Sequence, residues 1–118
     1  MNTFEALGIE EGLLQSIKLL GFTEPTPIQE KAIPVLLQGT KDFIGLAQTG
    51  TGKTAAFGLP LLQLIKKEDR FPQALIVYPT RELCLQINSD LEKFKSKKIN
   101  VNITAVYGGT SISMQIRD

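Results

Sequence analysis

The feature that most constrains the fold is a glycine-rich run at residues 47–54, which reads Ala-Gln-Thr-Gly-Thr-Gly-Lys-Thr. An apolar stretch at 42–47 precedes it and predicts a buried strand, whereas the apolar positions that follow Lys53 predict a helix. A strand that turns through glycines directly into a helix is the first half of a strand-helix-strand unit. The run therefore predicts an α/β fold.

The rest of the chain repeats this alternation. Residues 74–78 form a second continuous apolar stretch, and 101–107 alternate apolar and polar side chains, so both predict strands. A helix is expected after Thr80, between these two strands. Strands that alternate with helices in this way are typical of a parallel sheet with right-handed crossovers and flanking helices.

Two helices are expected before the glycine-rich run. The first carries apolar residues at helical spacing and stops at Gly21, and the second begins at Thr26-Pro27 and ends near Gly39. Pro34 is expected to break the second helix or to begin another short one. In the helix after Lys53, a kink or an early end is expected at Gly58 and Pro60.

Composition excludes several classes of site. The 118 residues carry a formal net charge of +1, so no overall basic character indicates a nucleic-acid partner. With no histidine and only Cys84, the chain lacks the usual zinc-ligand sets, an internal disulfide and every histidine-based catalytic arrangement. No apolar run approaches the length of a membrane span, and the start lacks a signal peptide, so we expect a cytoplasmic protein without membrane contact.

The glycine-rich run has the chemistry of a phosphate site. Glycines at 50 and 52 let successive backbone N–H groups surround phosphates, Lys53 neutralises the β- and γ-phosphates, and the Thr54 hydroxyl faces Mg²⁺. Ala47 replaces the first glycine of the strict pattern, and a small residue there still fits. An ordinary strand-to-helix turn is the alternative, and the Gly-Lys-Thr ending disfavours it.

Upstream, residues 21–29 read Gly-Phe-Thr-Glu-Pro-Thr-Pro-Ile-Gln and resemble the Q motif of DEAD-box RNA helicases. A glutamine amide both donates to adenine N7 and accepts from the N6 amino group, which makes Gln29 the candidate adenine reader. Phe4 stands where the family carries an isolated upstream aromatic, and Phe22 lies in the motif, so either is a candidate to cover the base. Without the resemblance, both aromatics read as core residues.

Downstream, residues 79–86 read Pro-Thr-Arg-Glu-Leu-Cys-Leu-Gln and are similar to motif Ia of the same family, with Cys84 where alanine is commoner. The resemblance implies that Thr80 and Arg81 contact the RNA sugar-phosphate backbone, without sequence preference. Gly108 and Gly109 match the family's glycine doublet, where close backbone approach to RNA is expected. Taken alone, a glycine pair indicates a turn.

The resemblance covers nearly the whole chain and implies the amino-terminal part of the first RecA-like P-loop domain of an ATP-dependent RNA helicase, with ATP and Mg²⁺ as cofactors. Lys53 and Thr54 are its catalytic candidates, and Thr54 its metal candidate. The implied nucleotide-binding residues are Phe4, Phe22, Gln29, Gln48, Thr49, Gly50, Thr51, Gly52, Lys53 and Thr54. The alternatives are a non-catalytic nucleotide- or RNA-binding fragment and a DNA-unwinding P-loop relative.

The chain ends at Asp118, before the family's acidic motif and second RecA-like domain. In the family, the strand that carries the acidic motif lies beside the P-loop strand. We therefore expect residues 1–118 alone to leave sheet edges unpaired, to self-associate or be partly disordered, and to lack the carboxylate that orients the attacking water.

Overall fold

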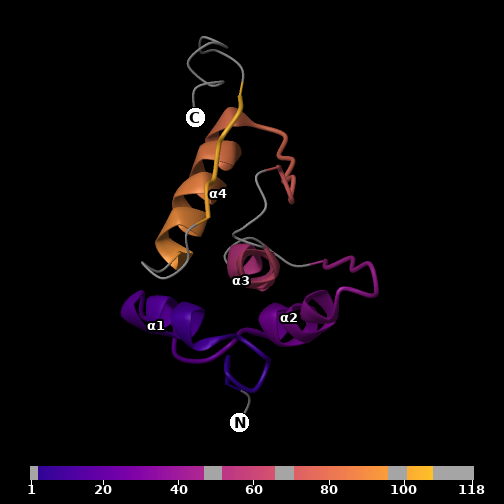
Figure 1. The fold of residues 1–118 in the computed structure, drawn as a ribbon, viewed down its shortest axis with the longest axis vertical. Coiled ribbons are helices and arrows are strands. Elements are labelled where there is room, and N and C mark those ends of the chain that lie inside the picture. The colour runs from indigo at the N-terminus through magenta and orange to yellow at the C-terminus, as the bar shows by residue number, and fades with distance from the viewer. Residues whose placement is uncertain (1–2, 47–51, 66–70, 96–100, 108–118) are drawn as a thin grey trace.

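The computed structural model describes residues 3–46, 52–65, 71–95 and 101–107, and these contain four α-helices (Figure 1). They are α1 (Glu11–Leu19), α2 (Pro27–Gln38), α3 (Lys53–Leu64) and α4 (Arg81–Phe94). Helix α3 lies at the centre and packs against α2 and α4, while α1 also contacts α4. The helix that follows the glycine-rich run is thus the one around which the others are arranged.

The predicted helix starts are confirmed. Thr26 is the N-cap of α2 and Pro27 its first residue, where a proline has no N–H to lose. Thr80 caps α4, because its hydroxyl accepts a hydrogen bond from the Leu83 backbone N–H at 3.2 Å. Helix α2 ends at Gly39, which adopts the left-handed conformation typical of helix ends.

The expected break at Pro34 and the expected early end at Gly58 or Pro60 are wrong. Helix α2 runs through Pro34, and α3 runs through both Gly58 and Pro60. Packing explains α3, because a Cβ at Gly58 would come within 2.8 Å of Leu91 on α4, so a glycine here lets the two helices approach closely. Pro60 is itself fully buried, and burial offsets the cost of the missing backbone hydrogen bond.

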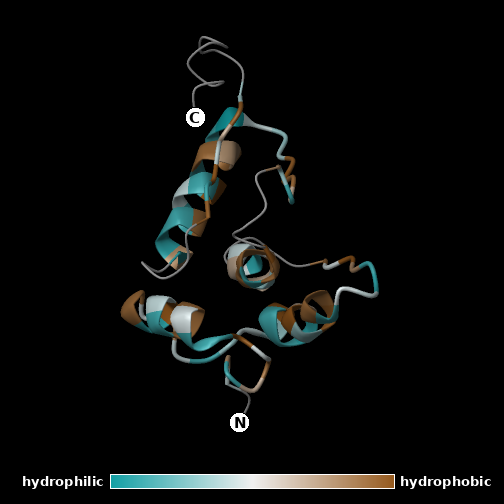
Figure 2. Cartoon of the chain, viewed as in Figure 1, coloured by the Kyte–Doolittle hydropathy of each residue, from teal (hydrophilic) through white to brown (hydrophobic). Residues whose placement is uncertain are grey.

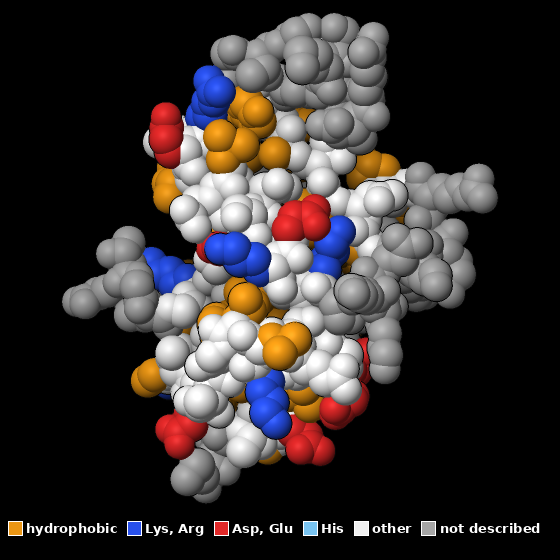
Figure 3. Space-filling model, turned by 90° about the vertical axis from the view of Figure 1, so that its left-hand side faces the viewer, with side chains coloured by type: hydrophobic (Ala, Val, Ile, Leu, Met, Phe, Trp, Pro, Cys, Tyr) orange, Lys and Arg blue, Asp and Glu red, His pale blue; other side chains and the backbone are white. Residues whose placement is uncertain are grey.

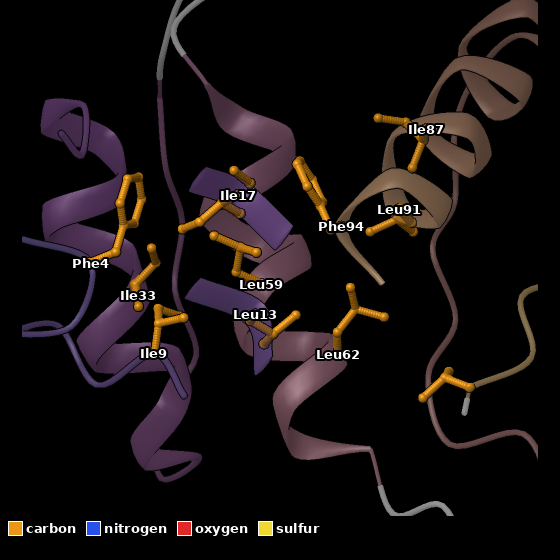
Figure 4. Close-up of a cluster of buried hydrophobic side chains, with 12 residues drawn as sticks. Phe4, Ile9, Leu13, Ile17, Ile33, Leu59, Leu62, Ile87, Leu91 and Phe94 are labelled. Atoms are coloured by element: carbon orange, nitrogen blue, oxygen red, sulfur yellow. The ribbon is translucent and has the colours of Figure 1, made fainter. Parts of the chain in front are cut away.

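A single apolar core joins the helices (Figure 4). Every helix contributes, and the amino-terminal segment adds two further side chains. On α4, Ile87, Leu91 and Phe94 face the core, whereas Leu83 is 43% exposed. The buried members of the core are Phe4, Ile9, Leu13, Ile17, Ile33, Ala55, Leu59, Leu62, Ile87, Leu91, Phe94 and Val101.

Gln63 fastens the amino-terminal segment to α3. Its side-chain amide donates to the Gly8 carbonyl at 2.9 Å and accepts from the Glu10 backbone N–H, also at 2.9 Å. Both bonds join residues that are more than fifty positions apart in the chain. They hold the segment that buries Phe4 and Ile9 against the rest of the core.

We expect Gln63→Met to lower the free energy of unfolding by about 1 to 2 kcal/mol, since it removes two hydrogen bonds and keeps the side-chain length. Gln15→Met is the matched control, because Gln15 is exposed and, among the described residues, its amide bonds only to Glu11 of the same helix. That variant is expected to stay within about 0.5 kcal/mol of the parent. Urea unfolding measures both, and an equal loss in the two variants would contradict the fastening role of Gln63.

The predicted parallel sheet is not confirmed. In the described residues, 42–46, 72–78 and 101–107 have no strand assignment. The alternation expected at 101–107 nevertheless appears in burial, since Val101, Ile103 and Ala105 face inward and their neighbours are exposed. Side-chain pattern orients each segment, but a strand also requires a hydrogen-bonded neighbour, and no described segment supplies one.

Apolar side chains stand exposed on these segments. Ile44 and Leu46 are 89% and 95% exposed, so the stretch before the glycine-rich run is not the buried strand that its composition predicts (Figure 2). Leu75 and Val77 are similarly open. A groove of about 820 Å³ is lined by residues of 71–78, 101–106, α3 and α4. A sheet that buries both faces would have to cover these surfaces.

Candidate functional site

Gln29 and Gly52 bring two distant motifs together. The Gln29 amide donates to the Gly52 carbonyl at 3.1 Å and accepts from the Thr26 backbone N–H at 2.9 Å. Gln29 is the first-turn residue of α2 that reaches across to the start of α3, and its side chain is only 1% exposed. An amide has two N–H donors and two acceptor positions, so one of each remains beyond these two bonds.

Gly52 has a conformation and surroundings that only glycine meets. Its φ is +84°, in the left-handed region, and it is the N-cap of α3. A Cβ at this position would collide with the Gln29 amide nitrogen and lie 3.2 Å from the Thr26 hydroxyl. The missing side chain therefore leaves room for α2 and the start of α3 to meet.

The start of α3 suits an anion. The N-cap residue Gly52 has no side chain to cap this helix, and the helix dipole adds positive potential at the first-turn N–H groups. Lys53 is exposed and Thr54 half-buried at the same helix end. Backbone donors, an ammonium group and a hydroxyl are the donor set that binds a phosphate chain with its metal ion. The residues present thus fit a nucleoside triphosphate.

Among the residues that the structure describes, the candidate metal contact at this helix start is a hydroxyl rather than a carboxylate. Within 3–46, 52–65, 71–95 and 101–107, no group of three or more Cys, Asp or Glu side chains is placed to hold a metal ion. The Thr54 hydroxyl is the described candidate for a metal contact. One hydroxyl suits Mg²⁺ that arrives with a phosphate group, because this ion keeps several waters and few protein ligands.

The two candidate aromatics lie in the core. Phe4 is only 4% exposed, and its ring is 6.3 Å from that of Phe22, centre to centre. Phe22 is half-buried and contacts Phe94 edge-on at 5.8 Å. The rings therefore link the amino-terminal segment to α4, and of the two candidates Phe22 has more surface left to meet a base.

Arg81 lies at the start of α4, directly after the capping residue Thr80. Its side chain is exposed, and the guanidinium carbon lies 5.0 Å from the centre of the Tyr107 ring. The motif around Arg81 and the segment that leads to the glycine doublet are therefore adjacent. Sequence reasoning assigned Tyr107 only to a strand, although an aromatic directly before two glycines was a signal worth considering.

Tyr78 directly precedes this motif, and among the described residues it is the titratable group whose pKa clearly departs from the ordinary value. Burial raises the pKa of its phenol above the ordinary value, and the Asp90 carboxylate raises it further. The phenol therefore stays neutral throughout the physiological range and keeps its O–H donor.

Charge is mixed on one face of the molecule. On the face shown in Figure 3, basic side chains lie singly and close to acidic ones rather than in one broad patch. This agrees with the net charge of +1. A nucleic acid would therefore be bound by individual well-placed groups such as Arg81 instead of by a general basic field.

Several predicted site residues lie outside the described residues. They are Gln48, Thr49, Gly50 and Thr51 of the glycine-rich run, and Gly108 and Gly109 of the doublet. Apart from Phe4 and Phe22, which lie at the core, the remaining candidates fall into two groups in the structure. Gln29, Gly52, Lys53 and Thr54 surround the start of α3, whereas Thr80 and Arg81 lie at the start of α4.

Comparisons with known sequences give a consistent result. A family model described as DEAD/DEAH box helicase matches residues 26–118. The ATP-dependent RNA helicase CshA of Listeria monocytogenes is 52% identical over 99% of the chain, and the DEAD-box ATP-dependent RNA helicase CshA of Geobacillus kaustophilus is 48% identical over the same share. The chain spans only 22% and 25% of the length of these two relatives.

Solved structures agree in fold. A DEAD box protein from the hyperthermophile Methanococcus jannaschii superimposes with a TM-score of 0.92 at 37% identity, covering 98% of this chain and 31% of that one. Dbp5 of S. cerevisiae, bound to RNA and ADP BeF3, has a TM-score of 0.75 at 39% identity, covering 80% and 24%. The path of the chain is therefore that of the RecA-like domain of such proteins, although the described segments lack strand hydrogen bonding.

None of the described helices has the length and apolar character needed to span a bilayer.

Proposed function

We propose that this chain, which belongs to the DEAD/DEAH box helicase family, supplies the ATP-capturing surface and part of the RNA-binding surface of an ATP-dependent RNA helicase. The activity proposed for the complete protein is ATP hydrolysis coupled to local separation of RNA duplexes. Support comes from relatives named as RNA helicases and from the chemistry of the two helix starts. The cytoplasmic location and the pairing with a second RecA-like domain stay predictions.

The observation that carries the proposal is the hydrogen bond from the Gln29 amide to the Gly52 carbonyl. It places a side chain suited to a base edge next to a helix start suited to phosphates. A nucleotide presents those two ends at once, and an isolated phosphate site would need only the second. The contact therefore favours a nucleoside triphosphate as the ligand over a simple anion.

Each residue has a defined task in this proposal. Lys53 compensates phosphate charge, the first-turn N–H groups of α3 donate to phosphate oxygens, and the Thr54 hydroxyl contacts Mg²⁺. When bound, Mg²⁺ neutralises the charge that develops on the phosphates. Gln48, Thr49, Gly50 and Thr51 complete the phosphate loop in the same proposal.

Adenine selectivity is assigned to Gln29. Its remaining N–H donates to N7 and its remaining acceptor position receives the N6 amino group, while it keeps its bonds to Thr26 and Gly52. Guanine presents two acceptors on the same edge, so it matches only one of these groups. Phe22 covers the base, and Phe4 holds Phe22 in place from the core side.

The RNA surface is assigned to the start of α4. Thr80 and Arg81 contact the sugar-phosphate backbone, and Gly108 and Gly109 allow the RNA to approach the main chain. Backbone contacts do not read sequence, so this surface binds unrelated RNAs alike. A DNA-unwinding relative and a non-catalytic binding fragment are the rival functions, and RNA-dependent phosphate release separates both from the proposed one.

We expect Gln29→Ala in the complete protein to weaken ATP binding by about 1 to 3 kcal/mol and GTP binding much less, because only adenine uses both amide groups. Titration calorimetry with both nucleotides measures the ratio. The matched control is Gln38→Ala, at the exposed carboxyl end of the same helix, which should leave both affinities unchanged. Equal losses for ATP and GTP would remove the base-reading role and reduce Gln29 to a structural link.

A further inference from the structure

Tyr107 and Arg81 form a contact between two parts of the chain that are distant in sequence. The Arg81 guanidinium carbon lies 5.0 Å from the centre of the Tyr107 ring, within the range of an attractive cation–π interaction. Tyr107 is half-buried and belongs to the inward-facing set of 101–107, whereas Arg81 is exposed. The more firmly held ring is therefore the support, and the arginine is the group that it holds.

The segment that carries Tyr107 is itself held alongside α4. Cys84 follows Arg81 by about one turn of α4, and its thiol lies 4.0 Å from the Val106 carbonyl. Toward the other end of the segment, the Lys95 ammonium group donates to the Val101 carbonyl at 2.6 Å. These two contacts hold 101–107 along the length of α4, so the position of the ring does not depend on Arg81 alone.

The geometry leaves the arginine able to bind an anion. A guanidinium group carries five N–H donors in its plane, and a contact between its carbon and the face of one ring leaves several of these donors for a ligand. Among the described residues, no carboxylate pairs with Arg81. A phosphate approaching in that plane can then accept two parallel hydrogen bonds. Without the ring, the same flexible side chain would have to be ordered when the phosphate binds.

We propose that Tyr107 is a positioning residue for RNA, whose ring holds the Arg81 guanidinium group ready for a backbone phosphate. This inference rests on the proposed function, in which Arg81 contacts RNA. It adds a residue that touches the arginine rather than the phosphate. Tyr107 also directly precedes the glycine doublet, so the same ring links the two stretches assigned to RNA.

The test is a double-mutant cycle in the complete protein, with a non-hydrolysable ATP analogue and fluorescein-labelled oligouridine and oligoadenosine of equal length. We expect Tyr107→Leu to lower the affinity for both RNAs about two- to fivefold, the range expected for one cation–π contact. Tyr107→Phe keeps the ring and should stay within about twofold of the parent. ATP affinity should be unchanged in both variants, which shows that the fold is retained.

Arg81 supplies the discriminating half of the cycle. Arg81→Ala is expected to weaken the binding of both RNAs. It should also make the slope of log affinity against log salt concentration shallower by about 0.7, the value for one phosphate contact on a single strand. In that background, Tyr107→Leu should have no further effect. An unchanged affinity in Arg81→Ala would overturn the proposed RNA contact itself.

Two results would overturn the positioning role while leaving the RNA contact of Arg81 intact. One is a Tyr107→Leu effect of the same size with and without Arg81, which would mean that the ring acts independently of the arginine. The other is tighter RNA binding in Tyr107→Leu, which would mean that the ring masks the guanidinium group.

Discussion

Lys53→Ala is expected to weaken ATP binding by the complete protein more than about 100-fold, because it removes charge-assisted hydrogen bonds to two phosphates, each worth about 1.5 to 3 kcal/mol. The loss should be similar for ATP and GTP, since the lysine contacts no part of the base. Lys53 is exposed and makes no ion pair with any described residue. Its removal should therefore leave the melting temperature unchanged, and calorimetric titration with either nucleotide measures the affinity.

Lys41→Ala is the matched control for that variant. Lys41 is another exposed lysine, located in the segment between α2 and the glycine-rich run, and it carries the same charge without lying at a helix start. We expect it to bind ATP like the parent. Unchanged ATP affinity in Lys53→Ala would remove the phosphate site, and equal losses in the two variants would indicate a general charge effect.

Gly52→Ala is expected to lower the free energy of unfolding by roughly 2 to 4 kcal/mol. A left-handed backbone conformation in a residue other than glycine accounts for about 1 to 3 kcal/mol. The new methyl group also displaces the Gln29 amide, which breaks its bond to the Gly52 carbonyl for about 1 kcal/mol more. Urea unfolding gives the stability.

Two further variants separate the backbone cost from the contact. Gly39 is also left-handed, with a φ of +68°, but a Cβ there would meet nothing within 4 Å. Gly39→Ala should therefore lower stability by only about 1 to 2 kcal/mol. In Gly52→Ala combined with Gln29→Ala, the collision is absent, so the loss should be smaller than the sum of the single losses. Equal losses in Gly52→Ala and Gly39→Ala would show that the Gln29 contact does not matter for stability.

Local chemistry was sufficient to predict where the helices start. Thr26-Pro27 and Thr80 act within a few residues of chain, and both helices begin as expected. The expected break at Pro34 and the expected early end at Gly58 or Pro60 were wrong, and in α3 tertiary packing outweighs local propensity. The approach of Leu91 to Gly58 depends on where α4 lies, which no local pattern of α3 contains.

Strands were harder to predict than helices for a physical reason. A helix satisfies its backbone within one segment, whereas a strand needs a partner elsewhere. The alternation at 101–107 correctly predicted which side chains of this segment face inward, but no hydrogen-bonded strand pair is found in the described residues. Likewise, the composition of 42–46 predicted burial, and Ile44 and Leu46 are exposed.

In the candidate site, too, individual residues could be predicted from the sequence, whereas contacts between distant segments could not. The P-loop pattern indicated Lys53, and the resemblance to the family's motifs indicated Gln29 and Arg81. The structure places Gln29 and Lys53 around the start of α3, and Arg81 at the start of α4. The bond from Gln29 to Gly52 and the ring of Tyr107 against Arg81 were not predicted, because each joins segments distant in sequence. Such contacts follow from the packing of α2, α3 and α4 rather than from any motif.

The central claim is that this chain captures ATP and contacts RNA in one protein. The most direct measurement is phosphate release by the complete protein with saturating ATP and Mg²⁺, with and without each of several unrelated RNAs. The account predicts release that all the RNAs stimulate to a similar extent, that GTP does not support, and that Lys53→Ala abolishes. Release that is the same with and without RNA, or that GTP supports equally well, would contradict it.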